Sequence, residues 1–227
     1  MPTKQVDIIV LSDIHLGSDM SRAEDLLATL GRYRFNTLIL NGDIFDNSNS
    51  KRLRNEHWEF LSYLRGLTEA GKEVIWVAGN HDRFAKDFFS LIGAQTCTEY
   101  IFEHAGRRYL VIHGNQYDKF LIKNEFMSDT LGSSYRMLQK LGGKKQRVSR
   151  MVKRRYKSWL RLSHRVAKGA IQHALSRNIN VVICSHTHQY MKTESHGVEY
   201  LNTGCWADRP SSFITIDGDG PKIQVFD

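Results

Sequence analysis

Short apolar runs rich in β-branched residues recur along the chain, separated by polar stretches. They occupy residues 6–11, 37–40, 74–77, 109–112 and 180–184. Near-continuous apolar runs of this length are typical of strands that are buried on both faces of a sheet. The pattern therefore predicts strands at these positions, in a sheet that is covered on both sides.

Two of the intervals between these runs place apolar side chains three or four residues apart, as an amphipathic helix does. The apolar residues are Leu26, Leu27 and Leu30 in the first interval and Trp58, Leu61, Leu64 and Leu67 in the second. The pattern predicts helices within residues 21–33 and 52–70. Alternation of strand and helix predicts a largely parallel sheet and the α/β class.

Later in the chain the pattern changes. Residues 100–113 are interrupted by Ala105 and Gly106, which predicts a hairpin. The short runs at 198–201, 213–216 and 222–226 predict a second, more antiparallel sheet.

Residues 118–177 carry no strand pattern, and Gly142 and Gly143 divide them. This segment predicts an amphipathic helix or helix pair. We interpret it as a helical cap insertion, at about residues 118–178, within a single domain that spans residues 1–227. Beyond the glycines, apolar side chains keep a spacing of three or four at Val148, Val152, Tyr156, Trp159, Leu160, Val166, Ala170 and Ala174.

The net charge of +8 is concentrated in this segment. Between Ser133 and Arg177 there are 14 Lys or Arg residues and no Asp or Glu. Subtracting these from the 32 basic residues leaves 18, against 24 acidic residues, in the rest of the chain. A strongly basic element on a mildly acidic body indicates an anionic partner.

The N-terminal residues lack the apolar stretch of a signal peptide. The apolar run at residues 8–11 is too short to span a bilayer. The three cysteines, Cys97, Cys184 and Cys205, have no paired spacing, which suits a reducing compartment. We therefore expect a cytoplasmic protein whose cysteines are small core or loop residues.

Asp, His and Asn residues follow directly after each of the five strands predicted first. Ligands of open α/β sheets bind outside the carboxyl ends of the strands, so we expect these side chains to converge. Asp13 and His15, two residues apart on an extended segment, would point to one side, and His186 and His188 repeat this spacing. The whole set is Asp13, His15, Asp43, Asn80, His81, Asp82, His113, His186 and His188.

These residue types suit a pair of divalent cations about 3.5–4 Å apart, which activate a water and polarise a phosphoryl group. A carboxylate such as that of Asp43 can bridge two cations, while imidazole nitrogens and an amide oxygen fill outer positions. For Asp46, a role as a turn or cap residue and a role in the site both stay open. The histidines outside the set are interpreted as surface or structural residues: His57, His104, His164, His173 and His196.

In this order, the D-x-H, G-D, G-N-H-D, H and H-x-H blocks between Asp13 and His188 resemble the calcineurin-like metallophosphoesterase superfamily. The resemblance implies a four-layer αββα sandwich and two divalent metal ions, Mn²⁺ first, with Mg²⁺, Fe²⁺ or Zn²⁺ as alternatives. It also implies that a metal-bridging hydroxide attacks phosphorus in line. One metal would be held by Asp13, His15 and His188, the other by Asn80, His113 and His186, with Asp43 between them. His81 would contact the phosphate and act as general acid, and Asp82 would orient it.

Further features resemble the branch that contains UDP-2,3-diacylglucosamine diphosphatase. They are the sequences LSDIHLG at 11–17, HGNQYD at 113–118 and YLNTG at 200–204, and the insertion. The resemblance implies an insertion that accommodates acyl chains, and substrate contacts from Asn80, His81, Tyr117 and Asp118. Tyr156 and Trp159 would suit a membrane interface, and each basic residue near anionic headgroups is worth roughly 1 kcal/mol. Three positions depart from this branch: His81 stands where Arg is usual, Asn115 where Asp is, and Ser185 where Gly is.

We therefore predict a dinuclear-metal-dependent hydrolase of a phosphoester or pyrophosphate bond. Its substrate would be lipid-linked, such as UDP-2,3-diacylglucosamine, and the protein would contact the anionic inner face of the cell membrane peripherally. The alternative is a nuclease or nucleotide phosphodiesterase, because the same basic segment would bind nucleic acid with strong salt dependence. A third hypothesis is a non-catalytic scaffold, although no ligand position of the family is vacant. The sequence leaves the oligomeric state open.

Overall fold

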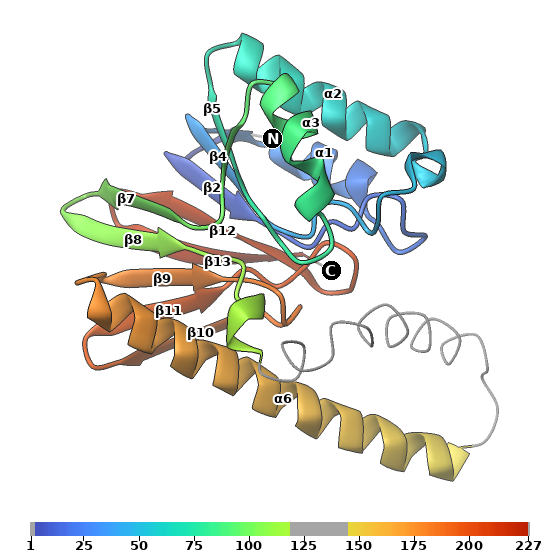
Figure 1. Cartoon of the computed structure of the whole chain (residues 1–227), viewed down its shortest axis with the longest axis vertical. Coiled ribbons are helices and arrows are strands. Elements are labelled where there is room, and N and C mark those ends of the chain that lie inside the picture. The colour runs from blue at the N-terminus through green and yellow to red at the C-terminus, as the bar shows by residue number, and fades with distance from the viewer. Residues whose placement is uncertain (1–2, 119–144, 227) are drawn as a thin grey trace.

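The computed structural model describes residues 3–118 and 145–226, and two β-sheets packed face to face form its centre (Figure 1). Side chains between 145 and 159 lie outside the described part. The first sheet has six strands in the order β13 (Gly220–Phe226), β12 (Ser211–Asp217), β2 (Ile8–Leu11), β4 (Thr37–Asn41), β5 (Glu73–Val77) and β6 (Gln95–Cys97). The second has five, in the order β10 (Met191–Ser195), β11 (Val198–Asn202), β9 (Val181–Cys184), β8 (Arg107–Val111) and β7 (Tyr100–His104).

Parallel pairing places the ends of the central strands at one edge. In the first sheet β2, β4, β5 and β6 are parallel, while β12 and β13 add an antiparallel pair beside β2. In the second sheet β8, β9 and β11 are parallel, with β7 and β10 antiparallel at the two edges. The carboxyl ends of β2, β4, β5, β8 and β9 therefore carry the loops in which the predicted site residues lie.

Helices cover both outer faces, which gives four layers (Figure 1). Helices α1 (Ala23–Leu30), α2 (Asn55–Glu69) and α3 (Lys86–Leu91) cover the first sheet. Helix α6 (Lys145–Ser176) lies on the second sheet. Short 3₁₀ turns η1 (Ser50–Arg52), η2 (Arg83–Ala85) and η3 (Asn115–Tyr117), and a small ladder of β1 (Lys4–Gln5) with β3 (Tyr33–Arg34), complete the described elements.

The alternation of side chains along each strand builds three apolar layers. In β2, Ile8 and Val10 face the second sheet, whereas Ile9 and Leu11 face the helices. A strand between two such layers has no solvated face, which explains its continuous apolar sequence. The αββα sandwich implied by the resemblance is confirmed.

Most elements expected from the sequence are present, with two differences. Strands β2, β4, β5, β8 and β9, helices α1 and α2 and the β7–β8 hairpin match their predicted segments within a few residues. The late strands do not form a sheet of their own: β11 joins the second sheet beside β9, whereas β12 and β13 extend the first. The short elements β6, β10 and α3 were not predicted, because three to six residues carry too little periodicity.

Helix α6 is part of the sandwich in its carboxyl-terminal half. Val166, Ala170 and Ala174 are buried against the outer face of the second sheet, together with Ala167 and Ile171. This part of the predicted apolar stripe therefore packs on protein. The glycine break at 142–143 and the side chains of Tyr156 and Trp159 lie outside the described residues. None of the described helices combines the length and the hydropathy that crossing a membrane requires.

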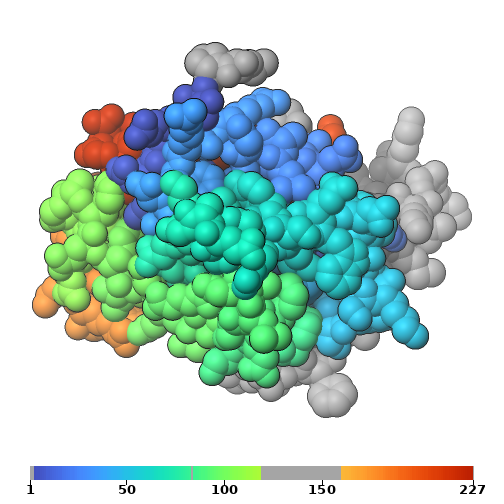
Figure 2. Space-filling view, turned by 90° about the horizontal axis from the view of Figure 1, so that it is seen from above, coloured from blue at the N-terminus to red at the C-terminus, as the bar shows by residue number. Residues whose placement is uncertain are grey.

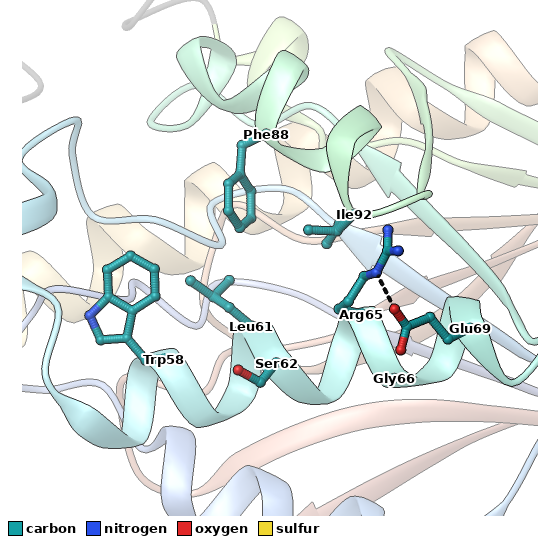
Figure 3. Close-up of a pocket in the computed structure, with 8 residues that line it drawn as sticks. All are labelled: Trp58, Leu61, Ser62, Arg65, Gly66, Glu69, Phe88 and Ile92. Carbon is teal, nitrogen blue, oxygen red and sulfur yellow. Dashed lines mark hydrogen bonds and ion pairs between the residues drawn. The ribbon is translucent and has the colours of Figure 1, made fainter.

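A shallow groove of about 320 Å³ lies between α2 and α3, on the face that Figure 2 shows. Figure 3 shows Trp58, Leu61, Phe88 and Ile92 along it, with the Arg65–Glu69 ion pair at one end. None of the residues that line it belongs to the predicted metal set. The groove is therefore distinct from the strand-end loops.

Candidate metal centre

Asp13, His15 and His188 form the first cluster at the strand ends. One nitrogen or oxygen atom from each lies within 4.8 Å of the others. The Nε2 atom of His188 is 3.2 Å from Asp13 Oδ1 and 3.3 Å from His15 Nε2. Two of these residues follow β2 in the first sheet and the third follows β9 in the second. The cluster therefore draws its members from both sheets.

Asp43, His113 and His186 form the second cluster, with the same 4.8 Å limit. The Nε2 atom of His113 is 3.3 Å from Asp43 Oδ2. Asp43 follows β4, while the two histidines follow β8 and β9, so this cluster also joins the two sheets. Asp43 is tied to the first cluster through the backbone, since its carbonyl accepts from the His15 N–H at 3.1 Å.

The backbone at these positions is unusual. Asp13, His15, Asp43, His186 and His188 all have left-handed conformations, with φ between 50° and 67°. Such angles are uncommon outside glycine and cost of order 1–3 kcal/mol each. This corrects the expectation that Asp13 and His15 share a side because their segment is extended. They converge because two successive left-handed turns fold the loop back on itself.

The donor atoms of the clusters fit cations. Asp13 Oδ1, Asn80 Oδ1, His113 Nε2 and His186 Nε2 are buried and form no hydrogen bond with the described residues, although all but the Asn80 atom lie within 3.5 Å of an oppositely charged group. Buried polar atoms are normally hydrogen-bonded. A ligand set of oxygens and imidazole nitrogens, without thiolate, is suited to Mn²⁺, Mg²⁺, Fe²⁺ or Zn²⁺. Asn80, which the three-residue clusters do not include, contributes an oxygen of this kind.

The electrostatics of the second cluster also call for positive charge. Burial by itself would raise the pKa of Asp43, but the adjacent His113 holds that pKa well below its usual range. Burial opposes protonation of His113, yet the Asp43 carboxylate raises the histidine pKa to about 9. In the first cluster, burial and the neighbouring His188 lower the pKa of His15 to about 4. Metal ligation requires neutral imidazole, so a cation bound here would replace the proton that the Asp43 carboxylate favours on His113.

Groups behind the ligands hold the second cluster in orientation. His113 Nδ1 is 2.8 Å from the Asn41 carbonyl oxygen and 2.8 Å from Ser185 Oγ, which turns its Nε2 toward Asp43. Asn202 donates to the Ser185 carbonyl at 2.7 Å and to Thr187 Oγ1 at 3.2 Å. Partners of this kind fix the ring and tautomer of a ligating histidine.

The first cluster has its own support. Ser12 Oγ donates to the Asp13 carboxylate and is 2.7 Å from Thr203 Oγ1. Asp208 Oδ2 lies 3.6 Å from His188 Nδ1, and Cys205 belongs to a further group with these two residues. Sequence reasoning missed Ser12, Asp208 and the role of Asn202. The sequence YLNTG, noted above as a resemblance, was the available signal for Asn202.

His81 and Asp82 lie beside the clusters, and their described contacts differ. The His81 ring is 5.4 Å from that of His15, and its Nδ1 is 3.2 Å from the Asp46 carbonyl oxygen. The hydrogen bonds of Asp82 go to the backbone N–H groups of Ile44, at 2.7 Å, and Gly79, at 3.0 Å. Asp82 therefore joins the loop after β4 to the loop after β5. The His81 ring is oriented by the Asp46 carbonyl instead.

Asp46 lies beside the first cluster, in contact with both the site and its own loop. Its Oδ1 is 3.9 Å from His15 Nδ1, and its Oδ2 accepts from Arg52 at 2.6 Å. His57, interpreted as surface or structural, is structural: its Nδ1 accepts from the N–H groups of Gly17 and Arg54. These two residues fix the loop that follows the D-x-H block.

Tyr117 and Asp118, expected as substrate contacts, make contacts within the protein. The Tyr117 hydroxyl shares a hydrogen bond with His173 on α6, so it is already engaged. Asp118 is buried, and its Oδ2 is 3.5 Å from His186 Nε2. The substrate contacts expected of these two residues stay a prediction.

A four-layer sandwich with paired Asp/His clusters at its strand ends defines a fold of the metallophosphoesterase type. Residues 6–190 match the family model for calcineurin-like phosphoesterases. The protein belongs to the calcineurin-like phosphoesterase family. A search among curated proteins finds no significant match.

Solved structures with similar folds agree with this assignment. A single mutant of Vps29 from Entamoeba histolytica has a TM-score of 0.51 and 16% identity, covering 97% of this chain and 98% of that one. An archaeal phosphodiesterase has a TM-score of 0.53 and 15% identity, with coverage of 96% and 99%. Vps29 from Chaetomium thermophilum has a TM-score of 0.51 and 12% identity, with coverage of 98% and 95%. At these identities the likeness shows a shared fold.

Gly79 tests whether the clusters need their present spacing. A Cβ atom at Gly79 would lie 2.2 Å from Asp43 Oδ1 and 2.4 Å from the Asp43 nitrogen. We expect Gly79→Ala to displace the Asp43 carboxylate and to weaken Mn²⁺ binding by about 10- to 100-fold, as measured by calorimetry. Gly66→Ala is the matched control, since a Cβ there meets nothing within 4 Å. Equal Mn²⁺ affinity in both variants would contradict the assignment.

Proposed function

We propose that the protein hydrolyses a phosphoester or pyrophosphate bond with the help of two divalent cations, Mn²⁺ first among them. The convergence of Asp13, His15 and His188 with Asp43, His113 and His186 carries this proposal. Family membership supports the class of reaction, and the buried unpaired donor atoms support the cations.

Asp13, His15 and His188 would hold one cation, and Asn80, His113 and His186 the other, with Asp43 between them. When bound, the two cations supply an activated water and neutralise the charge that develops on the phosphoryl oxygens. The protein residues keep this centre dry and rigid: Asp13 and Asp43 are 0% and 2% exposed. Preorganised charge in such a site lowers the barrier because little reorganisation accompanies the reaction.

His81 would hold the proton that the leaving oxygen needs. Its backbone N–H donates to Asp43 Oδ1 at 2.9 Å, which places the residue at the edge of the second cluster. If Nδ1–H donates to the Asp46 carbonyl, Nε2 is the ring nitrogen left for the substrate. A proton given from Nε2 to the departing oxygen completes the hydrolysis.

Asp43→Asn tests the metal-assisted reaction. The change replaces a buried carboxylate, which would contact both cations, with a neutral amide. We expect it to abolish turnover of bis(4-nitrophenyl) phosphate at saturating Mn²⁺. Asp87→Asn, on an exposed position of α3, removes the same charge and should keep wild-type turnover. Wild-type turnover in Asp43→Asn would reject the proposal.

His81→Asn separates proton donation from binding, because an amide can still donate to the Asp46 carbonyl but transfers no proton to substrate. We expect kcat to fall by about 10²–10⁴-fold for an alkyl phosphodiester, whose leaving oxygen needs a proton. The 4-nitrophenyl ester should be affected far less, since 4-nitrophenolate leaves unprotonated. An equal loss on both esters, at unchanged Mn²⁺ content, would exclude His81 as the acid.

We further propose a lipid-linked diphosphate such as UDP-2,3-diacylglucosamine as substrate, met at the cytoplasmic face of an anionic membrane. The basic segment between Ser133 and Arg177 supports this, and so does the resemblance of the sequence blocks described above.

A joint change of Lys153, Arg154 and Arg155 to Ala tests this substrate class. At roughly 1 kcal/mol per charge, the triple variant should bind anionic phosphatidylserine vesicles roughly 100-fold more weakly. Replacing the exposed Lys4, Lys51 and Lys86 with Ala gives the matched control. Both should be assayed on UDP-2,3-diacylglucosamine, single-stranded DNA and cyclic nucleotides. Hydrolysis of DNA or cyclic nucleotides without the lipid substrate would replace this proposal with a nuclease or nucleotide phosphodiesterase.

A further inference from the structure

A polar contact fastens the loop after β8 to helix α6. The Tyr117 hydroxyl lies 2.5 Å from Nδ1 of His173, which is one of the histidines outside the family blocks. On the other side of the ring, His173 Nε2 is 3.7 Å from Glu99 Oε2. Arg177 forms an ion pair with the same Glu99. His173 is therefore held from both sides, and Tyr117 is fixed against the helix.

The Tyr117 ring is also seated on the helix by shape. A Cβ atom at Gly169 would lie 2.8 Å from Tyr117 Cδ1 and 3.0 Å from Tyr117 Cβ. Glycine in a helix lowers helix stability by about 1 kcal/mol relative to alanine. At position 169 it also lets the Tyr117 ring approach the helix closely. Because Cβ of Tyr117 is involved, a larger residue at 169 would push the backbone of η3 as well as the ring.

The residue next to Tyr117 lies against the second metal cluster. Asp118 is 3% exposed, and its Oδ2 is 3.5 Å from Nε2 of His186. The intervening backbone is short and hydrogen-bonded, with the N–H of Tyr117 donating to the Gly114 carbonyl and that of Asp118 to the Asn115 carbonyl. A shift of the Tyr117 ring therefore moves the Asp118 carboxylate by way of a single tight turn.

We propose that Tyr117, His173 and Asp118 are positioning residues that couple the seat of helix α6 to metal affinity at His186. This inference rests on the proposed function, because it concerns one of its two metal sites. Asp118 stands outside the family blocks, yet it places a negative charge beside a ligand whose own backbone is left-handed at φ 67°. Because Nε2 of His186 is also the atom that would bind the cation, the Asp118 carboxylate would lie beside that cation, and its negative charge would strengthen binding there.

The coupling is reciprocal by thermodynamic necessity. A substrate or membrane contact that shifts α6 would change cation affinity at His186, and a cation bound there would stabilise the docked helix. The path ends at His186, which belongs to the second cluster, so we expect the larger change in affinity at that site. The path therefore distinguishes the two metal sites.

Calorimetric titration of the metal-free full-length protein with Mn²⁺ tests the coupling. We expect Asp118→Asn to weaken one of two sites by about 10- to 100-fold, and Tyr117→Phe to weaken the same site by about 10-fold. The variant carrying both changes should resemble Asp118→Asn alone, because the hydroxyl acts through the carboxylate. Gly169→Ala should repeat the effect of Tyr117→Phe from the helix side.

Tyr63→Phe on α2 is the matched control and should leave both affinities unchanged. A merely structural contact would lower the unfolding temperature of the metal-free Tyr117→Phe variant and leave both Mn²⁺ affinities at the wild-type value. That result overturns the inference. The inference is also overturned if Tyr117→Phe lowers the Mn²⁺ affinity equally in the wild-type protein and in the Asp118→Asn variant. Both leave the proposed function in place. Wild-type protein that binds no Mn²⁺ would overturn the proposed function together with the inference.

Discussion

Two carboxylates buried within one small volume set the requirement that the rest of the structure meets. Asp13 and Asp43 are almost fully excluded from solvent, and each such charge costs several kcal/mol to bury without compensation. Their neighbours supply that compensation in the form of imidazole rings, backbone N–H groups and hydroxyls. The site therefore has a built-in demand for positive charge, which two divalent cations would meet in the working protein.

The fold satisfies this demand by bringing loops from both sheets to one edge. Backbone hydrogen bonds join the loops after β2 and β4, and side chains such as Ser185 and Asn41 join them to the loops after β8 and β9. Five ligand positions adopt left-handed backbone angles, and the surrounding bonds hold them there. The strain is consistent with a preorganised site, since it persists only where neighbouring structure over-determines the conformation.

The sequence was sufficient for the strands, the two long helices and the positions of the ligands, because each rests on a local pattern. The D-x-H and H-x-H spacings identified residues that the fold brings together, although for the wrong geometric reason. The Asp13 and His15 N–H groups donate to the carbonyls of Gly42 and Asp43, which are distant in sequence. The supporting groups Ser12 and Asp208 could not be predicted, and the role of Asp46 stayed open, since a polar residue in a loop acquires its role only from partners brought close by folding. The sheet to which β12 and β13 belong was likewise decided by tertiary pairing.

The distribution of each cluster over both sheets links catalysis to the apolar layer between them. Neither sheet alone holds a complete set of ligands, so a cation bound in either cluster would cross-link the two sheets. Interior apolar residues set the separation of the two sheets. They include Val10, Ile39, Ile183 and Leu201. Substitutions in that layer are therefore constrained twice. They must preserve the stability of the fold, and they must preserve the distances between the cluster residues at the strand ends.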